Sequence, residues 1–129
     1  MKGLREQETQ ELRREFEGGE NSFLGKSLAG TWDSPAFRQL CALLQTACVA
    51  SENDSHVAKW MAAGFYDLDT NLDRYLPPLL GLEADFVDEV KEHFMFLACW
   101  FFSGVCPFES PQLLQAELEE ILKKSPNSD

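Results

Sequence analysis

A run of uncharged residues extends from Phe94 to Phe108 and limits the folds open to this chain. The run is 15 residues long, which is short of the roughly 20 residues that a helix needs to span a bilayer. Its first part, FMFLACWFF, would be apolar on every face of a helix, and such a helix has to be surrounded by protein. We therefore predict a buried central helix near residues 83–103, ended by Gly104, and no membrane insertion.

The aliphatic residues predict an all-α fold. The chain of 129 residues contains 18 leucines but only five valines and one isoleucine, whereas strands are enriched in β-branched residues. No segment alternates between apolar and polar residues for long enough to indicate a strand. We expect a compact bundle of about five helices around the central one, for which armadillo- or HEAT-like packing is one arrangement that fits.

Charge and glycine divide the chain into four predicted parts. Residues 1–17 form a charged helical segment with a thin apolar stripe, so we expect it to fray or to dock weakly. Residues 18–31 contain four glycines and are expected to be a flexible linker. Residues 32–124 are the helical domain, in which Ser34-Pro35 and Ser110-Pro111 each predict an N-cap followed by proline at the first helical position. Residues 125–129 are expected to be a tail.

The net charge restricts the partners. The chain has 11 basic and 22 acidic residues, a net charge of −11, which argues against binding to nucleic acid or to an anionic membrane surface. The N-terminus lacks the apolar segment of a signal peptide. The four cysteines lie in apolar stretches and are expected to be buried free thiols. Together these features favour the cytoplasm or the nucleus.

Three motifs suggest cofactor chemistry but depart from the patterns that such chemistry needs. Residues 19–27 resemble a phosphate-binding loop but have one residue too many between the glycines, and no strand precedes them. Residues 67–73 begin like a calcium loop but lack its glycine and its final glutamate. His93, Cys99 and Cys106 have neither zinc-ligand spacing nor the placement of a catalytic pair. We expect no cofactor, no metal site and no enzymatic activity.

The leading hypothesis is a protein-interaction module or adaptor. An acidic surface with an excess of apolar residues suits a basic or amphipathic helical segment bound in an acid-rimmed hydrophobic groove. Aromatic residues are the usual anchors, and the predicted contact residues are Trp60, Phe65, Tyr66, Tyr75, Trp100 and Phe102. Self-association into a homo-oligomer is a variant of this hypothesis. The alternatives are an apolar-ligand or lipid carrier with a cavity near Phe94, Phe96 and Trp100, and an accessory subunit of an enzyme complex.

One modification site is predicted. Ser34, Ser110 and Ser125 each precede a proline, which is the pattern that proline-directed kinases recognise. The first two serines are explained as N-caps. Ser125 belongs to the predicted tail, so it is the candidate for phosphorylation.

Overall fold

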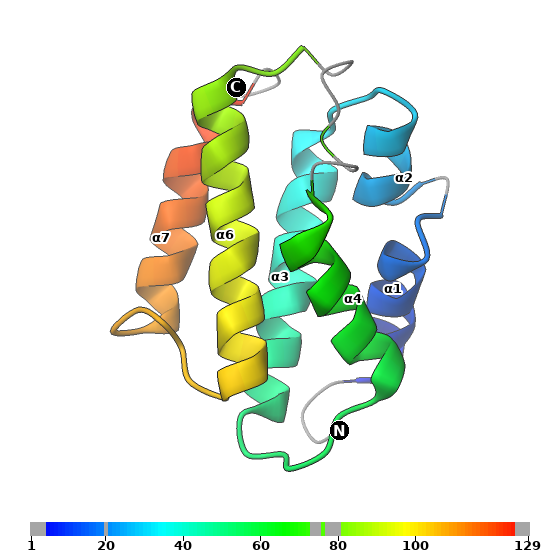
Figure 1. Cartoon of the computed structure of the whole chain (residues 1–129), viewed down its shortest axis with the longest axis vertical. Helices are drawn as coiled ribbons and strands as arrows, with labels where there is room; N and C mark the ends of the chain where they lie inside the picture. The colour runs from blue at the N-terminus through cyan, green and yellow to red at the C-terminus, as the bar shows by residue number, and fades with distance from the viewer. Residues whose placement is uncertain (1–4, 20, 73–75, 77–80, 126–129) are drawn as a thin grey trace.

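The computed structural model describes residues 5–19, 21–72, 76 and 81–125. These residues form a bundle of six helices and contain no strand (Figure 1). The helices are α1 (Glu6–Phe16), α2 (Phe23–Leu28), α3 (Ser34–Ser51), α4 (Lys59–Thr70), α6 (Ala84–Ser103) and α7 (Pro111–Leu122). The predicted all-α bundle is confirmed.

Helix α6 is the central helix that the uncharged run predicts. It packs against α4, α3 and α7, and Phe94, Leu97 and Trp100 on it are almost fully buried. Gly104 ends the helix with a φ of 77°, a left-handed conformation that glycine adopts without strain. The burial is incomplete, since Phe102 is 56% exposed on this helix. No helix in the described part of the chain is long and apolar enough to cross a membrane.

The start of α3 differs from the prediction. Asp33, not Ser34, is the N-cap, and its carboxylate accepts a hydrogen bond of 2.9 Å from the Ala36 amide. Ser34 is buried and makes a different contact: its hydroxyl accepts the Trp32 indole N–H and donates to Ser125, both at 2.8 Å. Ser110 is the N-cap of α7, as predicted.

Ser125 does not lie in an exposed tail. It is 7% exposed, and its hydroxyl donates to the Leu122 carbonyl oxygen as well as accepting from Ser34. This bond joins the end of α7 to the start of α3 across 91 positions of sequence. The prediction of an accessible phosphorylation site is therefore wrong for the folded chain, because a kinase needs an exposed hydroxyl.

The predicted flexible linker contains α2, so the prediction of a linker is wrong for residues 23–28. Phe23 is fully buried, and its ring centroid lies 5.2 Å from that of Trp32 and 5.3 Å from that of Phe37. Gly25 permits close packing: a Cβ at this position would collide with the backbone carbonyl of Gly19. The glycine that suggested flexibility thus allows α2 to approach the chain that leads into it.

Helix α1 is also packed more firmly than its thin apolar stripe predicts. It contacts α2, α3 and α4, and Leu12 is fully buried. Phe16 at its last turn packs against the rings of Trp60 and Phe65, with centroid distances of 6.2 and 5.9 Å. Two anchors placed one helical turn apart are enough to attach α1 to the bundle.

Candidate functional site

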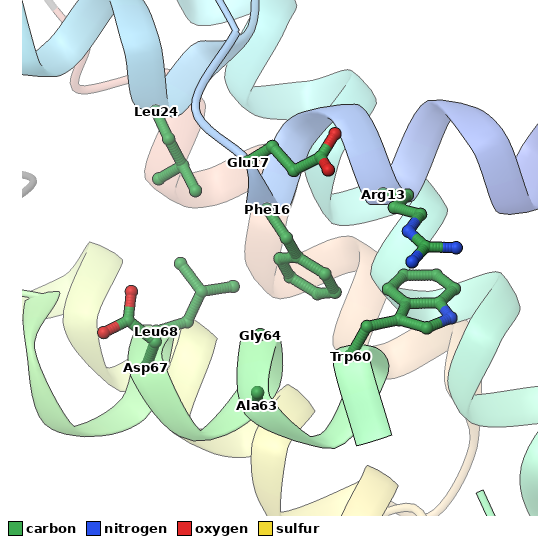
Figure 2. Close-up of a pocket in the computed structure, with 9 residues that line it drawn as sticks. All are labelled: Arg13, Phe16, Glu17, Leu24, Trp60, Ala63, Gly64, Asp67 and Leu68. Atoms are coloured by element: carbon green, nitrogen blue, oxygen red, sulfur yellow. The ribbon is translucent and has the colours of Figure 1, made fainter. Parts of the chain in front are cut away.

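A cleft of about 300 Å³ lies between α1 and α4 (Figure 2). It combines apolar side chains with charged groups contributed by both helices. The residues that line it are Arg13, Phe16, Glu17, Leu24, Trp60, Ala63, Gly64, Asp67 and Leu68. We take this cleft as the candidate functional site, because concave, mostly apolar surfaces with a few polar groups are where proteins usually bind ligands.

Helical periodicity explains why these residues meet. On α4, Trp60, Gly64 and Asp67 lie at positions i, i+4 and i+7, which share one face of a helix. On α1 and its C-cap, Arg13, Phe16 and Glu17 lie at i, i+3 and i+4. The cleft lies between these two faces, where α1 and α4 run side by side (Figure 2).

The floor of the cleft depends on a glycine. A Cβ on Gly64 would collide with the ring of Phe16, so only glycine lets this ring lie directly on the backbone of α4. Leu68 and Leu24 continue the apolar lining beside it (Figure 2).

The rim of the cleft carries charge. The Arg13 guanidinium lies over the Trp60 ring, 5.3 Å from the centroid, in a cation–π contact. Glu17 and Asp67 supply carboxylates from α1 and α4, respectively. The Asn71 side-chain amide donates to Asp67 at 2.8 Å, which orients this carboxylate. The cleft therefore offers an apolar floor, an indole ring that carries a guanidinium on one face, and two carboxylates on its rim.

The predicted contact residues do not form one surface. Trp60 lines the cleft, whereas Tyr66 and Phe102 are 61% and 56% exposed outside it. Phe65 is buried and stacks on Phe101 with a centroid distance of 4.1 Å.

Trp100 is fully buried, and its indole N–H donates to Glu52 at 2.8 Å. It is therefore a core residue and not a contact residue. Tyr75 lies outside the described residues.

Sequence reasoning missed Arg13, Phe16, Glu17 and Gly64 as site residues. The available signal was the i, i+4, i+7 pattern that joins Trp60 to Asp67 through Gly64. The contribution of α1 was missed because residues 1–17 were expected to dock weakly.

The groups considered for catalysis or metal binding are separated or buried. Cys41 and Cys48 are buried, and burial raises the pKa of both thiols, which disfavours the reactive thiolate. Cys99, in contrast to the prediction, is exposed. The buried His93 ring contacts Glu117 at 2.8 Å across α6 and α7. Within the described residues, no three His, Cys, Asp or Glu side chains gather closely enough to hold a metal ion.

The loop that resembles a phosphate-binding motif has a structural role. Lys26, on α2, forms an ion pair of 2.6 Å with Asp33, and this contact holds the pKa of the Asp33 carboxyl below its usual range. The lysine therefore connects α2 to the N-cap of α3.

Glu15 makes the attachment of α1 to α2 sensitive to pH. Its carboxylate accepts a hydrogen bond of 3.1 Å from the Phe23 amide, while burial raises its pKa to about 7. A raised carboxyl pKa means that the folded state binds the proton more tightly than the unfolded state. The resulting stabilisation is complete below the unfolded pKa of about 4.5 and is lost as the pH rises through about 7.

We predict that Glu15→Gln removes this pH dependence. Relative to the wild type, the variant should gain about 1–2 kcal/mol of unfolding free energy at about pH 8 and little at about pH 5. The gain is limited to this size because solvent screens the partly buried carboxyl. Urea unfolding at both pH values measures the difference, and Glu17→Gln serves as the matched control. A constant difference between Glu15→Gln and the wild type at the two pH values would contradict the prediction.

The comparisons with known proteins add no functional assignment. No protein family, curated protein or solved structure matches this chain. A function for the cleft therefore has to be argued from its geometry and charge.

Proposed function

We propose that this protein is a non-catalytic interaction module whose α1/α4 cleft binds a short basic or amphipathic segment of another protein. The observation that carries the proposal is the combination in one cleft of an aromatic floor with two carboxylates, Glu17 and Asp67, on the rim. A Leu or aromatic side chain of the partner would occupy the floor. A Lys or Arg nearby on the partner would meet the carboxylates.

The size of the cleft favours a single anchor side chain. A volume of about 300 Å³ is at the lower end of the range for small-molecule sites, and it accommodates one large side chain better than the whole face of a helix. The ring of Phe16 is fixed between Trp60, Phe65 and the backbone at Gly64. A floor that is already ordered loses little conformational entropy when it binds.

The charge of the chain supports a basic partner. With a net charge of −11, the protein attracts cationic segments from a distance and speeds their encounter with the cleft. The Arg13 guanidinium lies over Trp60 and adds a positive charge to that part of the rim. This arrangement favours partners whose basic residue lies on the side of Glu17 and Asp67. We also propose that the protein acts in the cytoplasm or the nucleus, because its cysteines are free thiols.

The described contacts give the carrier hypothesis little support. Phe94 is 1% exposed and packs edge-on against Phe37, with a centroid distance of 5.6 Å. Phe96 packs in the same way against Phe108 at 5.0 Å. Both side chains therefore pack against other aromatic rings of the bundle. No specific observation favours the accessory-subunit hypothesis over a general interaction module.

A peptide-display selection tests the proposal. Random peptides selected on the immobilised full chain should be enriched in a Leu or aromatic residue close to Lys or Arg. Trp60→Ala should weaken the selected peptides by at least about tenfold, because aromatic anchors dominate small interfaces. The double variant Glu17→Gln/Asp67→Asn should slow association and reduce its dependence on salt. Fluorescence anisotropy of labelled peptides gives both quantities.

Tyr66→Ala is the matched control, because Tyr66 is an exposed aromatic residue on the same helix but outside the cleft. It should leave affinity unchanged. Selected peptides that bind Trp60→Ala as tightly as the wild type would show that the cleft is not the binding site. Circular dichroism verifies that each variant remains helical.

A further inference from the structure

Helix α3 carries little charge for a long helix of this acidic protein. Its 18 residues contain no Asp or Glu and one charged side chain, Arg38. Arg38 is paired with Glu119 of α7. By contrast, α1, α4, α6 and α7 all carry carboxylates. The solvent-facing side of α3 is therefore close to neutral in a chain whose net charge is −11.

A second groove, of about 360 Å³, runs along this neutral side between α3 and α7. Every residue that lines it is uncharged, and most are small. The lining residues are Ala42, Gln45, Thr46, Val49, Ala50 and Gln115. Val49 is 51% exposed, so an aliphatic side chain stands in water at the edge of an apolar groove.

The contacts between α3 and α7 show how the groove is bounded. Ser34 bonds to Ser125, and Arg38 pairs with Glu119, so the two helices run antiparallel and are joined at the N-terminal end of α3. The Gln115 side-chain amide also donates a hydrogen bond of 3.0 Å to Glu119. The Glu119 carboxylate is therefore held by both Arg38 and Gln115. The groove lies beyond these contacts, along the C-terminal half of α3.

We propose that this surface, which we call the α3/α7 face, is where two copies of the chain associate. Two chains that each carry −11 repel one another, so the contact between them has to bury a face that brings no like charges together. The groove of the α3/α7 face meets this condition, because none of the residues that line it is charged. The groove therefore offers a strongly acidic or basic partner no charge to pair with.

The geometry of α3 suits a two-fold axis. If α3 crosses its own copy near Thr46, Val49 of one chain reaches the groove of the other, and each contact occurs twice. Ala42, Thr46 and Ala50 repeat every four residues on this side, and their small side chains let two helices approach closely. The interface is small, so we infer a weak and reversible dimer.

The dependence on salt separates this proposal from the binding of a basic peptide in the α1/α4 cleft. Salt screens the repulsion between two acidic chains and should strengthen the dimer. The same salt should weaken the attraction of a basic peptide to Glu17 and Asp67. The two proposals therefore predict opposite changes in the same buffers, and either can fail without the other.

Sedimentation velocity of the full chain tests the proposal at concentrations up to about 1 mM, a range suited to a small interface. The weight-average sedimentation coefficient of the wild type should rise with concentration, and more steeply at about 0.3 M salt than at about 0.02 M. Val49→Glu should weaken the dimer by at least about tenfold, since it places two carboxylates in the interface. Val49 is exposed on a helix, where Glu is well tolerated, so the variant should fold.

Leu28→Glu is the control, because Leu28 is a comparably exposed aliphatic residue on α2, on the other side of the bundle from α7 (Figure 1). It should dimerise like the wild type. A wild-type chain that stays monomeric at high salt would overturn the proposal. Equal weakening by Val49→Glu and Leu28→Glu would overturn it as well, since the effect would then reflect charge alone.

Discussion

Trp100→Ala is expected to lower the free energy of unfolding by about 3–5 kcal/mol, the usual cost of truncating a large buried aromatic residue. Trp100 is fully buried on the central helix, and its indole N–H donates to Glu52 at 2.8 Å. The substitution leaves a cavity between helices that have little freedom to collapse. It also removes the hydrogen-bond partner that holds the Glu52 carboxylate. The loss of stability should therefore mask any change in partner binding.

Phe102→Ala provides the contrast. Phe102 is two residues further along the same helix, but it is 56% exposed, so its truncation should cost about 1 kcal/mol or less. Urea unfolding followed by circular dichroism measures both variants. If Trp100→Ala costs no more than Phe102→Ala, the assignment of Trp100 to the core is wrong.

Gly64→Ala is expected to destabilise the protein even though it replaces glycine within a helix. Alanine raises helix propensity by about 1 kcal/mol relative to glycine. Its Cβ, however, would collide with the Phe16 ring, and overpacking typically costs about 1–3 kcal/mol. We therefore expect a net loss of up to about 2 kcal/mol, together with faster hydrogen exchange in α1. The cleft should be altered as well, because Phe16 forms part of its floor.

A Phe16→Ala background identifies the cause. Without the ring, Gly64→Ala should become neutral or stabilising, because only the gain in propensity remains. Gly19→Ala is the matched control, since its Cβ would approach no atom closer than 3.8 Å. If Gly64→Ala costs the same with and without the Phe16 ring, the ring is not what requires glycine at this position.

The central helix was predictable because its signal is local. A run of apolar residues without charge admits few arrangements other than burial within protein, and α6 begins at Ala84 and ends at Ser103. The cap at Ser110 was predictable for the same reason, since the serine bonds to an amide three residues away. At Ser34 the same motif was misleading. The preceding residue, Asp33, is the N-cap of α3, and the Ser34 hydroxyl instead donates a hydrogen bond to Ser125.

The candidate site was only partly predictable. The sequence predicts Trp60 as a contact residue, because aromatic residues are the usual anchors of interfaces, and Trp60 lines the cleft. Which other aromatic residues are exposed depends on the position of each side chain relative to its neighbours in space. The adjacent residues Phe65 and Tyr66 are 1% and 61% exposed. Two neighbouring residues on one helix can differ this much in exposure because one side chain points into the bundle and the other points to solvent.

The helical class, the central helix and the acidic charge could be predicted, since each depends on composition or on the spacing of nearby residues. Three features became apparent only in three dimensions: α1 and α2 belong to the folded bundle, Ser125 is buried, and a cleft forms between α1 and α4. These outcomes depend on contacts between segments far apart in the chain. The Phe16 ring on Gly64 and the Ser34–Ser125 bond leave no pattern in either local stretch of sequence.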